Sequence, residues 1–249
     1  MSAFGRKSPR SYTKYRRDFD YSYTLGIFPS LELLSARPSS VIKVFLHSKS
    51  DRNEGAEKIR LACRLHGIEL EYNDKQIEFL SPKENCLGIA VFRKYDSELI
   101  RGNDHLLLVN PSNAGNLGTI LRTMLAFGFH DLAIVSPGVD IFHPGTVRSS
   151  MGAVFQVRWQ YFNSLGHYLS GHPNHLYPLM TDGREEIRNI RCRRPFTLIL
   201  GKESCGLDRS FDREGTSIRI PQSGDVDSLN LAVAAGIALY HVSQNNAGK

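Results

Sequence analysis

The sequence contains no long apolar run and no apolar stretch near its start that resembles a secretory h-region. Its apolar segments, such as LLLV at residues 106–109, fall far short of the ~20 residues that a helix needs to cross a bilayer. We therefore expect neither a membrane span nor secretion. Hydrophobic residues make up 41% of the 249 positions and charged residues 22%, which is typical of a globular chain with packed cores.

Cysteine is scarce and scattered. The four cysteines, Cys63, Cys86, Cys192 and Cys205, lack the paired C-x2-4-C spacing of a structural zinc site. Scattered thiols suit a reducing compartment, so we expect a cytoplasmic protein without a metal. Cys205 has no identifiable activating partner in the sequence, and we assign it no catalytic role.

Acidic residues are missing from positions 6–17, where RKSPRSYTKYRR interleaves tyrosines with basic side chains. Such a segment is typical of an arm that contacts RNA, of a solvated disordered tail, or of an organelle transit peptide, and the sequence leaves all three open. The chain has 31 Lys and Arg against 25 Asp and Glu, and this net charge of +6 favours a polyanionic partner without requiring one. The candidates for RNA contact in the tail are Arg6, Lys7, Arg10, Lys14, Arg16 and Arg17.

Strand and helix patterns divide the chain after a basic tail at residues 1–20. Residues 21–95 predict a small α/β domain, with helices at 28–34 and 54–66 and strands at 41–47, 68–72 and 88–92. Residues 96–103 are polar and charged and form a linker. Residues 104–249 predict a second domain, with strands at 106–110, 131–136, 155–159, 175–180, 196–201 and 217–221 and helices at 119–128, 148–153 and 229–241. Such alternation implies an α/β fold with a mostly parallel sheet.

A glycine-rich segment, NAGNLG at residues 113–118, separates a predicted strand from a helix that we expect to open at Thr119. Such turns offer backbone N–H groups to an anionic or polar ligand. The segment also resembles an incomplete dinucleotide-binding turn, but the next strand ends in SPG at residues 136–138 and lacks the acidic residue that would hold a ribose. Arg122 follows on the predicted helix among apolar neighbours, as either a site residue or a solvent-facing arginine in a salt bridge.

Two further segments place polar residues beside glycines. LILGKESCGL, at residues 198–207, is an apolar strand that runs into a loop with Glu203, and ligands of open α/β sheets bind at such strand ends. IPQSGDVDSLN, at residues 220–230, leads into an apolar helix for which we expect Ser228 as N-cap and Asn230 in the first turn. The small residues of this helix indicate close packing against its own sheet or against a second subunit: Ala232, Ala234, Ala235 and Gly236.

Together these segments resemble the SpoU/TrmH branch of the SPOUT RNA methyltransferases. Residues that resemble the first family motif are Asn116, Gly118 and Arg122. Those that resemble the second are Gly201, Glu203, Gly206 and Leu207. The third is similar in Ile220, Pro221, Gly224, Ser228, Leu229 and Asn230. Between the first two, a segment with Arg148, Ser150 and Gly152 resembles the family sequence R-x-S-x-G-A. These motifs span residues 104–242, and residues 21–95 resemble, less sharply, the small RNA-binding domain that many members carry.

The resemblance implies an RNA ribose 2′-O-methyltransferase that uses S-adenosylmethionine, with a deep trefoil knot in its C-terminal domain. It implies cofactor binding by the knot loops, at Leu200, Gly201, Glu203, Gly206, Ile220, Gly224, Ser228, Leu229 and Asn230. The catalytic residues that it implies are Arg122, Asn116, Glu203, Ser228 and Asn230, and Arg148 joins the candidates for RNA contact. Family members are homodimers whose site is completed at the interface, and we expect the same here.

Arg122 matches the catalytic residue of the family, yet a guanidinium is a poor proton acceptor near neutral pH because its pKa lies above about 12. We hypothesise that Arg122 binds the phosphate beside the target ribose and stabilises the developing alkoxide, while phosphate or water takes the proton. The other catalytic candidates would orient Arg122, substrate and cofactor. The separate N-terminal domain favours rRNA as substrate, with a tRNA methyltransferase or a non-catalytic RNA-binding member of the fold as alternatives. Housekeeping modification and antibiotic-resistance methylation both stay open.

Overall fold

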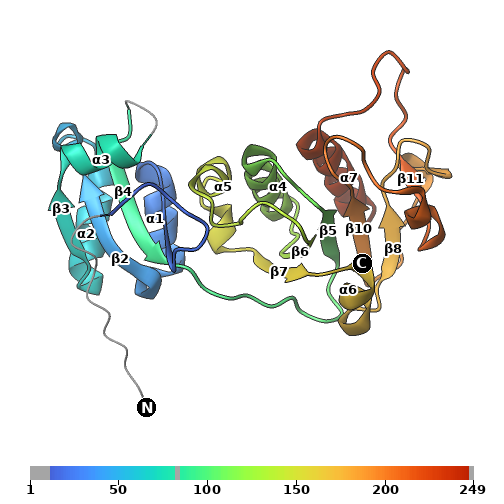
Figure 1. Cartoon of the computed structure of the whole chain (residues 1–249), viewed down its shortest axis with the longest axis horizontal. Helices are drawn as coiled ribbons and strands as arrows, with labels where there is room; N and C mark the ends of the chain where they lie inside the picture. Colours follow the sequence, from blue (N-terminus) through green and yellow to red (C-terminus); the bar gives the residue numbers. More distant parts are fainter. Residues whose placement is uncertain (1–11, 82–84, 247–249) are drawn as a thin grey trace. The chain divides into compact units, whose positions relative to one another are not determined.

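The computed structural model describes residues 12–81 and 85–246, and its contacts divide the chain into two compact units. The first unit combines the chain up to Lys94 with the segment Phe142–Phe155. The second combines Tyr95–Ile141 with the chain from Gln156 onward. The chain therefore passes between the units three times, where the sequence predicts a single linker. Figure 1 colours both units along the sequence.

The first unit is built on a mixed four-stranded sheet with the strand order β1-β4-β2-β3. β4 is antiparallel to β1 and β2, and β3 is parallel to β2. The strands are β1 Tyr21–Tyr23, β2 Val41–Leu46, β3 Glu69–Tyr72 and β4 Gly88–Arg93. The helices are α1 Ile27–Ala36, α2 Glu54–His66, α3 Asp74–Leu80 and α5 Pro144–Ser149. The sequence predicts this α/β organisation but misses β1 and α3, whose short segments carry little periodicity.

Helix α2 begins and ends where its sequence dictates. The side chain of Asn53 caps the helix by accepting a hydrogen bond from the backbone N–H of Ala56, and Glu54 lies in the first turn, where the helix dipole favours an acidic residue. Gly67 ends the helix in the left-handed conformation at φ +63°, which glycine adopts without strain. Ile59 and Cys63 are buried and anchor one face. These local signals explain why the predicted bounds 54–66 are confirmed.

The segment Phe142–Phe155 packs into the first unit although the sequence places it in the second domain. The ring of Phe92 on β4 meets Phe142 at 5.6 Å and Phe155 at 5.3 Å, both edge to face. Gly152 has φ +86°, and a Cβ atom built there would lie 2.3 Å from Cβ of Glu32 on α1. This packing depends on aromatic contacts between residues distant in sequence, which a reading of local periodicity does not detect.

The second unit contains a parallel five-stranded sheet with the order β7-β6-β5-β10-β8, as predicted for the fold class. The strands are β5 His105–Val109, β6 Asp131–Val135, β7 Arg158–Phe162, β8 His175–Pro178 and β10 Phe196–Leu200. Two short strands, β9 Glu185–Glu186 and β11 Ile218–Arg219, pair separately. The chain runs outward from β5 through β6 to β7, and then crosses to β8 and β10 on the other side of β5. The order therefore reverses between β5 and β10.

Helices α4 Ala114–Ala126 and α7 Leu231–Asn246 lie side by side on this sheet (Figure 1), and α6 Leu165–Gly171 is the third helix. A Cβ atom built on Gly236 would be 3.8 Å from the methyl group of Thr123, so the two helices approach closely. Further along, the rings of Phe127 and Tyr240 are 5.7 Å apart. The small residues of α7 thus serve, at least at Gly236, to pack it against its own unit.

Both site-bearing helices start at positions that differ from the sequence prediction. α4 begins at Ala114, not at Thr119, because the Asn113 side chain accepts a hydrogen bond from the backbone N–H of Asn116 and caps the helix. α7 begins at Leu231, and its cap is Asn230, not Ser228, because the Asn230 side-chain oxygen accepts from the N–H of Ala232 at 2.9 Å. In each case the side chain of an asparagine caps the helix: Asn113 starts α4 five residues earlier than predicted, and Asn230 starts α7 two residues later.

A chain of hydrogen bonds with a fixed direction is buried at the amino end of β5. His105 Nε2 must donate to the carbonyl of Ile100 at 2.9 Å, so its Nδ1 accepts from the hydroxyl of Tyr168 at 2.8 Å. Tyr168 in turn accepts from Thr197 at 2.6 Å, and Thr197 accepts from Asn174 at 3.1 Å. His105 is fully buried, and burial lowers its pKa. This series of hydrogen bonds requires His105 to be neutral, because Nδ1 must accept.

We expect the folded protein to lose stability as the pH falls from about 7 to 5. An unfolded histidine takes up a proton near its ordinary pKa of about 6.5, which folded His105 refuses because burial lowers its pKa. The contribution of neutral His105 to folding stability is therefore complete above the ordinary histidine pKa of about 6.5, and it is lost as the pH falls below that value. Protonation of Nδ1 would also leave the Tyr168 hydroxyl without its acceptor, at a cost of roughly 1–3 kcal/mol.

Urea unfolding at a series of pH values measures this dependence. The variant His105→Gln keeps one donor and one acceptor but cannot titrate, so it should show a weaker loss between pH 7 and pH 5 than the wild type. His172 also has a pKa lowered by burial and retains its own share of the effect in the variant. Parallel pH curves for the two proteins would contradict the assignment to His105.

Candidate active site

The site predicted from sequence lies where the strand order of the second unit reverses. In open parallel sheets the loops that follow the two strands beside such a reversal separate and leave room for a ligand. Here these loops are residues 110–113 after β5 and residues 201–207 after β10. Both carry motif residues from the sequence analysis, so the topology brings together segments that are ninety residues apart in the chain.

Glu203 joins the two loops. Its Oε2 accepts hydrogen bonds from the backbone N–H of Ser112 at 3.2 Å and from the Ser112 hydroxyl at 2.9 Å. Its Oε1 accepts from the backbone N–H of Asn113 at 3.2 Å and from the Asn116 amide at 3.4 Å. The carboxylate therefore accepts hydrogen bonds from backbone and side-chain donors at the start of α4.

The protonation state of Glu203 follows from its hydrogen bonds. Burial alone raises the pKa of this carboxyl, but hydrogen bonds, first from the backbone N–H of Glu203 itself and then from Ser112 and Asn116, outweigh burial and leave the pKa below its usual value. Glu203 is thus ionised at neutral pH and is a poor proton donor or acceptor there. This electrostatic environment suits a residue that positions its neighbours.

The third motif connects to the same network through Asn230. The Asn230 amide donates to the Asn116 side-chain oxygen at 3.2 Å, while the Asn230 oxygen caps α7. A continuous path therefore runs from the start of α7 through Asn116 to Glu203 and Ser112. The structure brings Asn116, Glu203 and Asn230 together as the sequence analysis predicts, but Ser228 makes no such contact among the hydrogen bonds of the described residues.

A pocket of about 280 Å³ opens beside Glu203. It is lined by the loops after β8 and β10 and by the chain that leads into α7. Seven of the nine cofactor candidates line it: Leu200, Gly201, Glu203, Gly206, Ile220, Ser228 and Leu229. Gly224 and Asn230 are not among the lining residues; Asn230 instead caps α7. The volume approaches the lower end of the ~300–1,000 Å³ typical of small-molecule sites.

Gly201 is the tightest point of the pocket wall. A Cβ atom built there would lie 2.1 Å from the carbonyl carbon of Gly206, because the loop folds back on itself and the N–H of Gly206 donates to the carbonyl of Lys202 at 2.9 Å. Gly206 adopts φ +66° with open space around it. The two glycines of this motif therefore serve different needs, close approach at Gly201 and a left-handed turn at Gly206.

Arg122 is exposed on α4 and does not line the pocket of its own chain. Within residues 12–81 and 85–246 it forms no hydrogen bond or ion pair, so its guanidinium is free to bind another molecule. The exposed positions of α4 follow helical spacing on one face: Gly115, Thr119, Arg122 and Ala126. A solvent-facing arginine with a structural ion pair, the alternative interpretation, is thus not what the structure contains.

The basic residues assigned to RNA contact fall in two groups. Arg6, Lys7 and Arg10 lie outside the described residues. Lys14, Arg16, Arg17 and Arg148 belong to the first unit. From Tyr12 onward the tail packs on this unit, since Tyr12 is 3% exposed and the hydroxyl of Tyr23 donates to the carbonyl of Thr13 at 2.6 Å. Arg16 pairs with Asp18 at 3.0 Å, and Arg17 holds the Lys94 ammonium through its carbonyl.

Some residues beside the candidate site are not predicted from the sequence. Ser112 supplies two of the hydrogen bonds to Glu203. Its place in the loop after a predicted strand, next to Pro111, is the one sequence feature that could have marked it as a site residue. Lys202, Asp182 and Asp227 line the pocket, although nothing in their local pattern marks them. Their relation to the site depends on three loops meeting, which only the fold determines.

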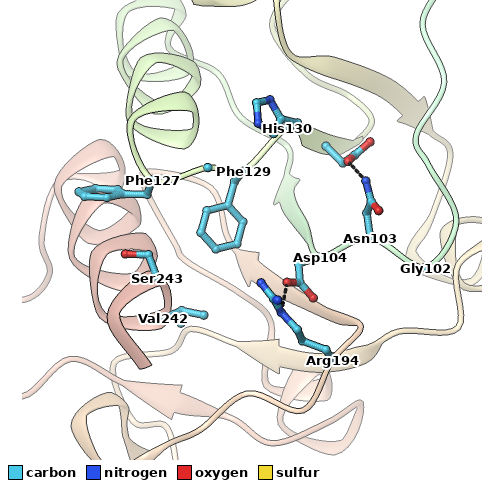
Figure 2. A pocket seen from close by; sticks show the side chains of 11 residues that line it. Gly102, Asn103, Asp104, Phe127, Phe129, His130, Arg194, Val242 and Ser243 are labelled. Carbon is cyan, nitrogen blue, oxygen red and sulfur yellow. Dashed lines mark hydrogen bonds and ion pairs between the residues drawn. The ribbon is translucent and has the colours of Figure 1, made fainter. Parts of the chain in front are cut away.

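A second pocket, of about 440 Å³, lies at the opposite, amino ends of β5 and β6. Figure 2 shows Arg194 turned toward Asp104, and the two form an ion pair at 2.6 Å. Asp131 is likewise paired with Arg158 at 2.6 Å and accepts from the Asn103 amide at 2.8 Å. Because the charges at its wall are already paired with one another, this pocket offers few free groups to a charged ligand.

No set of three or more His, Cys, Asp or Glu side chains in residues 12–81 and 85–246 is placed to hold a metal ion. No helix in that part of the chain is long and apolar enough to span a membrane.

Comparisons with known proteins agree with this geometry. The family model described as the SpoU rRNA Methylase family matches residues 104–240. A putative TrmH family tRNA/rRNA methyltransferase of Bacillus subtilis, YacO, is 30% identical over 238 residues, covering 89% of this chain and 95% of that protein. The 23S rRNA (uridine(2479)-2'-O)-methyltransferase of Streptomyces viridochromogenes is 29% identical over 154 residues, 58% of this chain. The matched part spans about half the length of that Streptomyces relative, 54%.

A solved structure extends the likeness to nearly the whole chain. The AdoMet-bound rRNA methyltransferase of Sinorhizobium meliloti matches with a TM-score of 0.77 and 25% identity, covering 91% of this chain and 88% of that one. The family match covers more than half of the sequence and contains all three motifs. The chain therefore belongs to the SpoU rRNA methylase family.

Proposed function

We propose that this protein transfers the methyl group of S-adenosylmethionine to a ribose 2′-hydroxyl in RNA. The observation that carries the proposal is the hydrogen-bond network of Glu203, which joins three motif-bearing segments across the strand reversal, beside a pocket that follows β8 and β10. The Streptomyces relative is named a 2'-O-methyltransferase, and the Sinorhizobium structure is described as bound to AdoMet. These names support the reaction and the cofactor proposed here.

The pocket fits this cofactor by the chemistry of its wall. Leu200, Ile220 and Leu229 supply apolar surface for a flat base, while the loop around Gly201 offers backbone polar groups. When bound, S-adenosylmethionine supplies a methyl group on a sulfonium, which is already a good leaving group. The protein must then hold the 2′-hydroxyl in line with that methyl group and lower the cost of removing its proton.

Arg122 is the residue that we propose for this task. Its guanidinium binds the phosphate beside the target ribose and stabilises the negative charge that develops on the 2′-oxygen, while phosphate or water takes the proton. Asn116, Glu203 and Asn230 position the start of α4 and the cofactor loop around it. Ser228, which lines the pocket, completes the catalytic set carried over from the family.

We further propose that the protein is a homodimer and that Arg122 acts in the pocket of the partner subunit. Arg122 does not line the pocket of its own chain, and it lies on a face of α4 with the small residues Thr119 and Ala126, which allow close approach. The neighbouring helix α7 exposes Val233, Ile237 and Tyr240 at helical spacing. A second copy would cover this apolar stripe and complete the site.

The substrate that we favour is rRNA, with tRNA as the alternative. The first unit adds an α/β surface with basic side chains to the methylase unit, and both the Streptomyces and the Sinorhizobium relatives are named for rRNA. The net charge of +6 supports a polyanionic partner. We also propose a knotted C-terminal domain and a cytoplasmic location, for which the free state of all four cysteines is supporting chemistry.

Transfer of labelled methyl groups tests the reaction. Purified protein is incubated with labelled S-adenosylmethionine and, separately, with rRNA and tRNA that lack the modification, and the RNA is digested to nucleosides. Labelled 2′-O-methyl nucleosides from rRNA are the expected result. Label in tRNA alone would keep the reaction and reassign the substrate. No label in either pool, with cofactor bound, would favour a non-catalytic RNA-binding member of the fold.

The cofactor site makes a separate prediction at Gly201. We expect Gly201→Ala to weaken S-adenosylhomocysteine binding at least about ten-fold, since the new Cβ would displace the backbone of Gly206, where the wall cannot yield without opening the loop. Gly206→Ala should act more mildly, because it meets open space and costs only about 1–2 kcal/mol of left-handed strain. Isothermal titration calorimetry compares the two, and equal losses would argue against close approach as the role of Gly201.

A further inference from the structure

Three charged side chains at the pocket beside Glu203 lack partners. Lys202, Asp182 and Asp227 line the pocket and are exposed. In the described part of the chain none of the three side chains forms a hydrogen bond or an ion pair. They come from three separate segments, the loop after β8, the loop after β10 and the chain leading into α7. The pocket rim thus carries one free positive and two free negative charges.

The other ionised group of the pocket is not available to neutralise Lys202. The Glu203 carboxylate already accepts four hydrogen bonds from residues 112–116, and no ion pair joins it to its neighbour Lys202 in residues 12–81 and 85–246. The pocket at the amino ends of β5 and β6 provides a contrast, because there Asp104 and Asp131 each hold an arginine. Of these two pockets, the one beside Glu203 is therefore the one whose lining carries unpaired charges in the described part of the chain.

The backbone of Lys202 is held in place. The N–H of Gly206 donates to its carbonyl at 2.9 Å, and the close approach of Gly201 to Gly206 fixes the other side of the loop. Lys202 is therefore a flexible side chain on a rigid base, which can reach an anion near the pocket without reorganising the loop.

We propose that this rim recognises the amino-acid end of the cofactor, an inference that rests on the proposed use of S-adenosylmethionine. That end of the molecule carries one carboxylate and two positive groups, the ammonium and the sulfonium. The rim carries the complementary set: Lys202 binds the carboxylate, and Asp182 and Asp227 face the positive groups. Backbone groups and apolar walls bind the nucleoside, so the charged side chains set the preference for a complete cofactor.

Calorimetry with two ligands isolates this effect. S-adenosylhomocysteine carries the amino-acid end, whereas 5′-methylthioadenosine keeps the nucleoside and lacks that end. We expect Lys202→Met to weaken S-adenosylhomocysteine about five-fold, as for an exposed charge pair, and to leave 5′-methylthioadenosine unchanged. Lys202→Arg should restore most of the loss. The double variant Asp182→Asn, Asp227→Asn should show the same selectivity between the two ligands.

Arg209→Met is the matched control, because Arg209 is an exposed cation close by in the chain that does not line the pocket. It should change neither affinity. Equal losses for both ligands, or equal losses in Lys202→Met and Arg209→Met, would overturn the proposal. So would a Lys202→Met variant that binds S-adenosylhomocysteine normally but needs more RNA for half-maximal rate, which would assign Lys202 to an RNA phosphate. Failure of the wild type to bind either ligand would instead reject the proposed function.

Discussion

Replacing Arg122 with alanine is expected to lower methyl transfer by a factor on the order of 100 to 1,000, the usual effect of removing one group that stabilises a developing oxyanion. S-adenosylhomocysteine affinity should not change, because Arg122 does not line the pocket of its own chain and holds no described residue in place. Single-turnover methyl transfer at saturating RNA, combined with calorimetry, separates the two effects.

Two further variants sharpen this result. Arg122→Lys keeps the positive charge but loses the two-pronged geometry of the guanidinium, so it should recover only part of the rate. Arg209→Ala removes an exposed arginine of the same unit that does not line the pocket, and it should retain the wild-type rate. If Arg122→Ala kept full activity, the proposed mechanism would have to be abandoned, whereas a parallel loss of cofactor binding would make Arg122 a structural residue.

Mixing two defective proteins reveals whether Arg122 serves its own pocket or that of its partner. In a heterodimer of one Arg122→Ala subunit and one Gly201→Ala subunit, the first keeps an intact pocket and the second keeps an intact arginine. If each arginine acts in the pocket of the partner subunit, these two meet and form one working site. If half of the dimers are mixed and each has one working site of two, about a quarter of the wild-type activity returns. An arginine that served its own chain would restore none.

The sequence predicts the fold well where local signals suffice. Helix α2 is bounded by Asn53 and Gly67 and lies where its pattern places it, and the second unit contains the predicted parallel sheet. The strand predicted at 217–221 is the exception, since it is reduced to β11 and pairs with β9 outside that sheet. The helix starts next to the site are less well predicted, because glycines obscure the start of α4 and because Ser228 and Asn230 are both suitable caps for α7. Glycines at 115 and 118 suggest a turn, yet Asn113 caps a helix that includes both.

The resemblance supplies candidate residues for the site but not the contacts between them. Motif resemblance identifies Asn116, Glu203 and Asn230, and the structure joins them by hydrogen bonds. It cannot identify Ser112, because its bonds to Glu203 arise from the reversal of strand order, which brings the loops after β5 and β10 together. The placement of residues 142–155 in the first unit has the same cause, a contact between residues distant in sequence.

The proposed dimer makes the second large prediction, through Ile237. Val233, Ile237 and Tyr240 are 51%, 39% and 55% exposed along α7, an apolar stripe with little reason to face water in a single chain. In a two-fold interface each residue is present once from each subunit, in equivalent surroundings. Ile237→Glu therefore introduces two carboxylates into one apolar interface. Burying an unpaired charge costs about 3–5 kcal/mol, enough to shift a micromolar dimer to monomers.

Sedimentation velocity at micromolar concentration should give the wild type a mass near twice 28.0 kDa, about 56 kDa. Ile237→Glu should sediment as a monomer and lose methyl transfer as severely as Arg122→Ala, because the arginine of one chain can no longer reach the pocket of the other. Leu61→Glu is the control, since Leu61 is 61% exposed on α2 of the first unit and should leave mass and activity unchanged. A wild type that is monomeric and active would show that Arg122 reaches its own pocket by a movement of α4, and the shared site would be wrong.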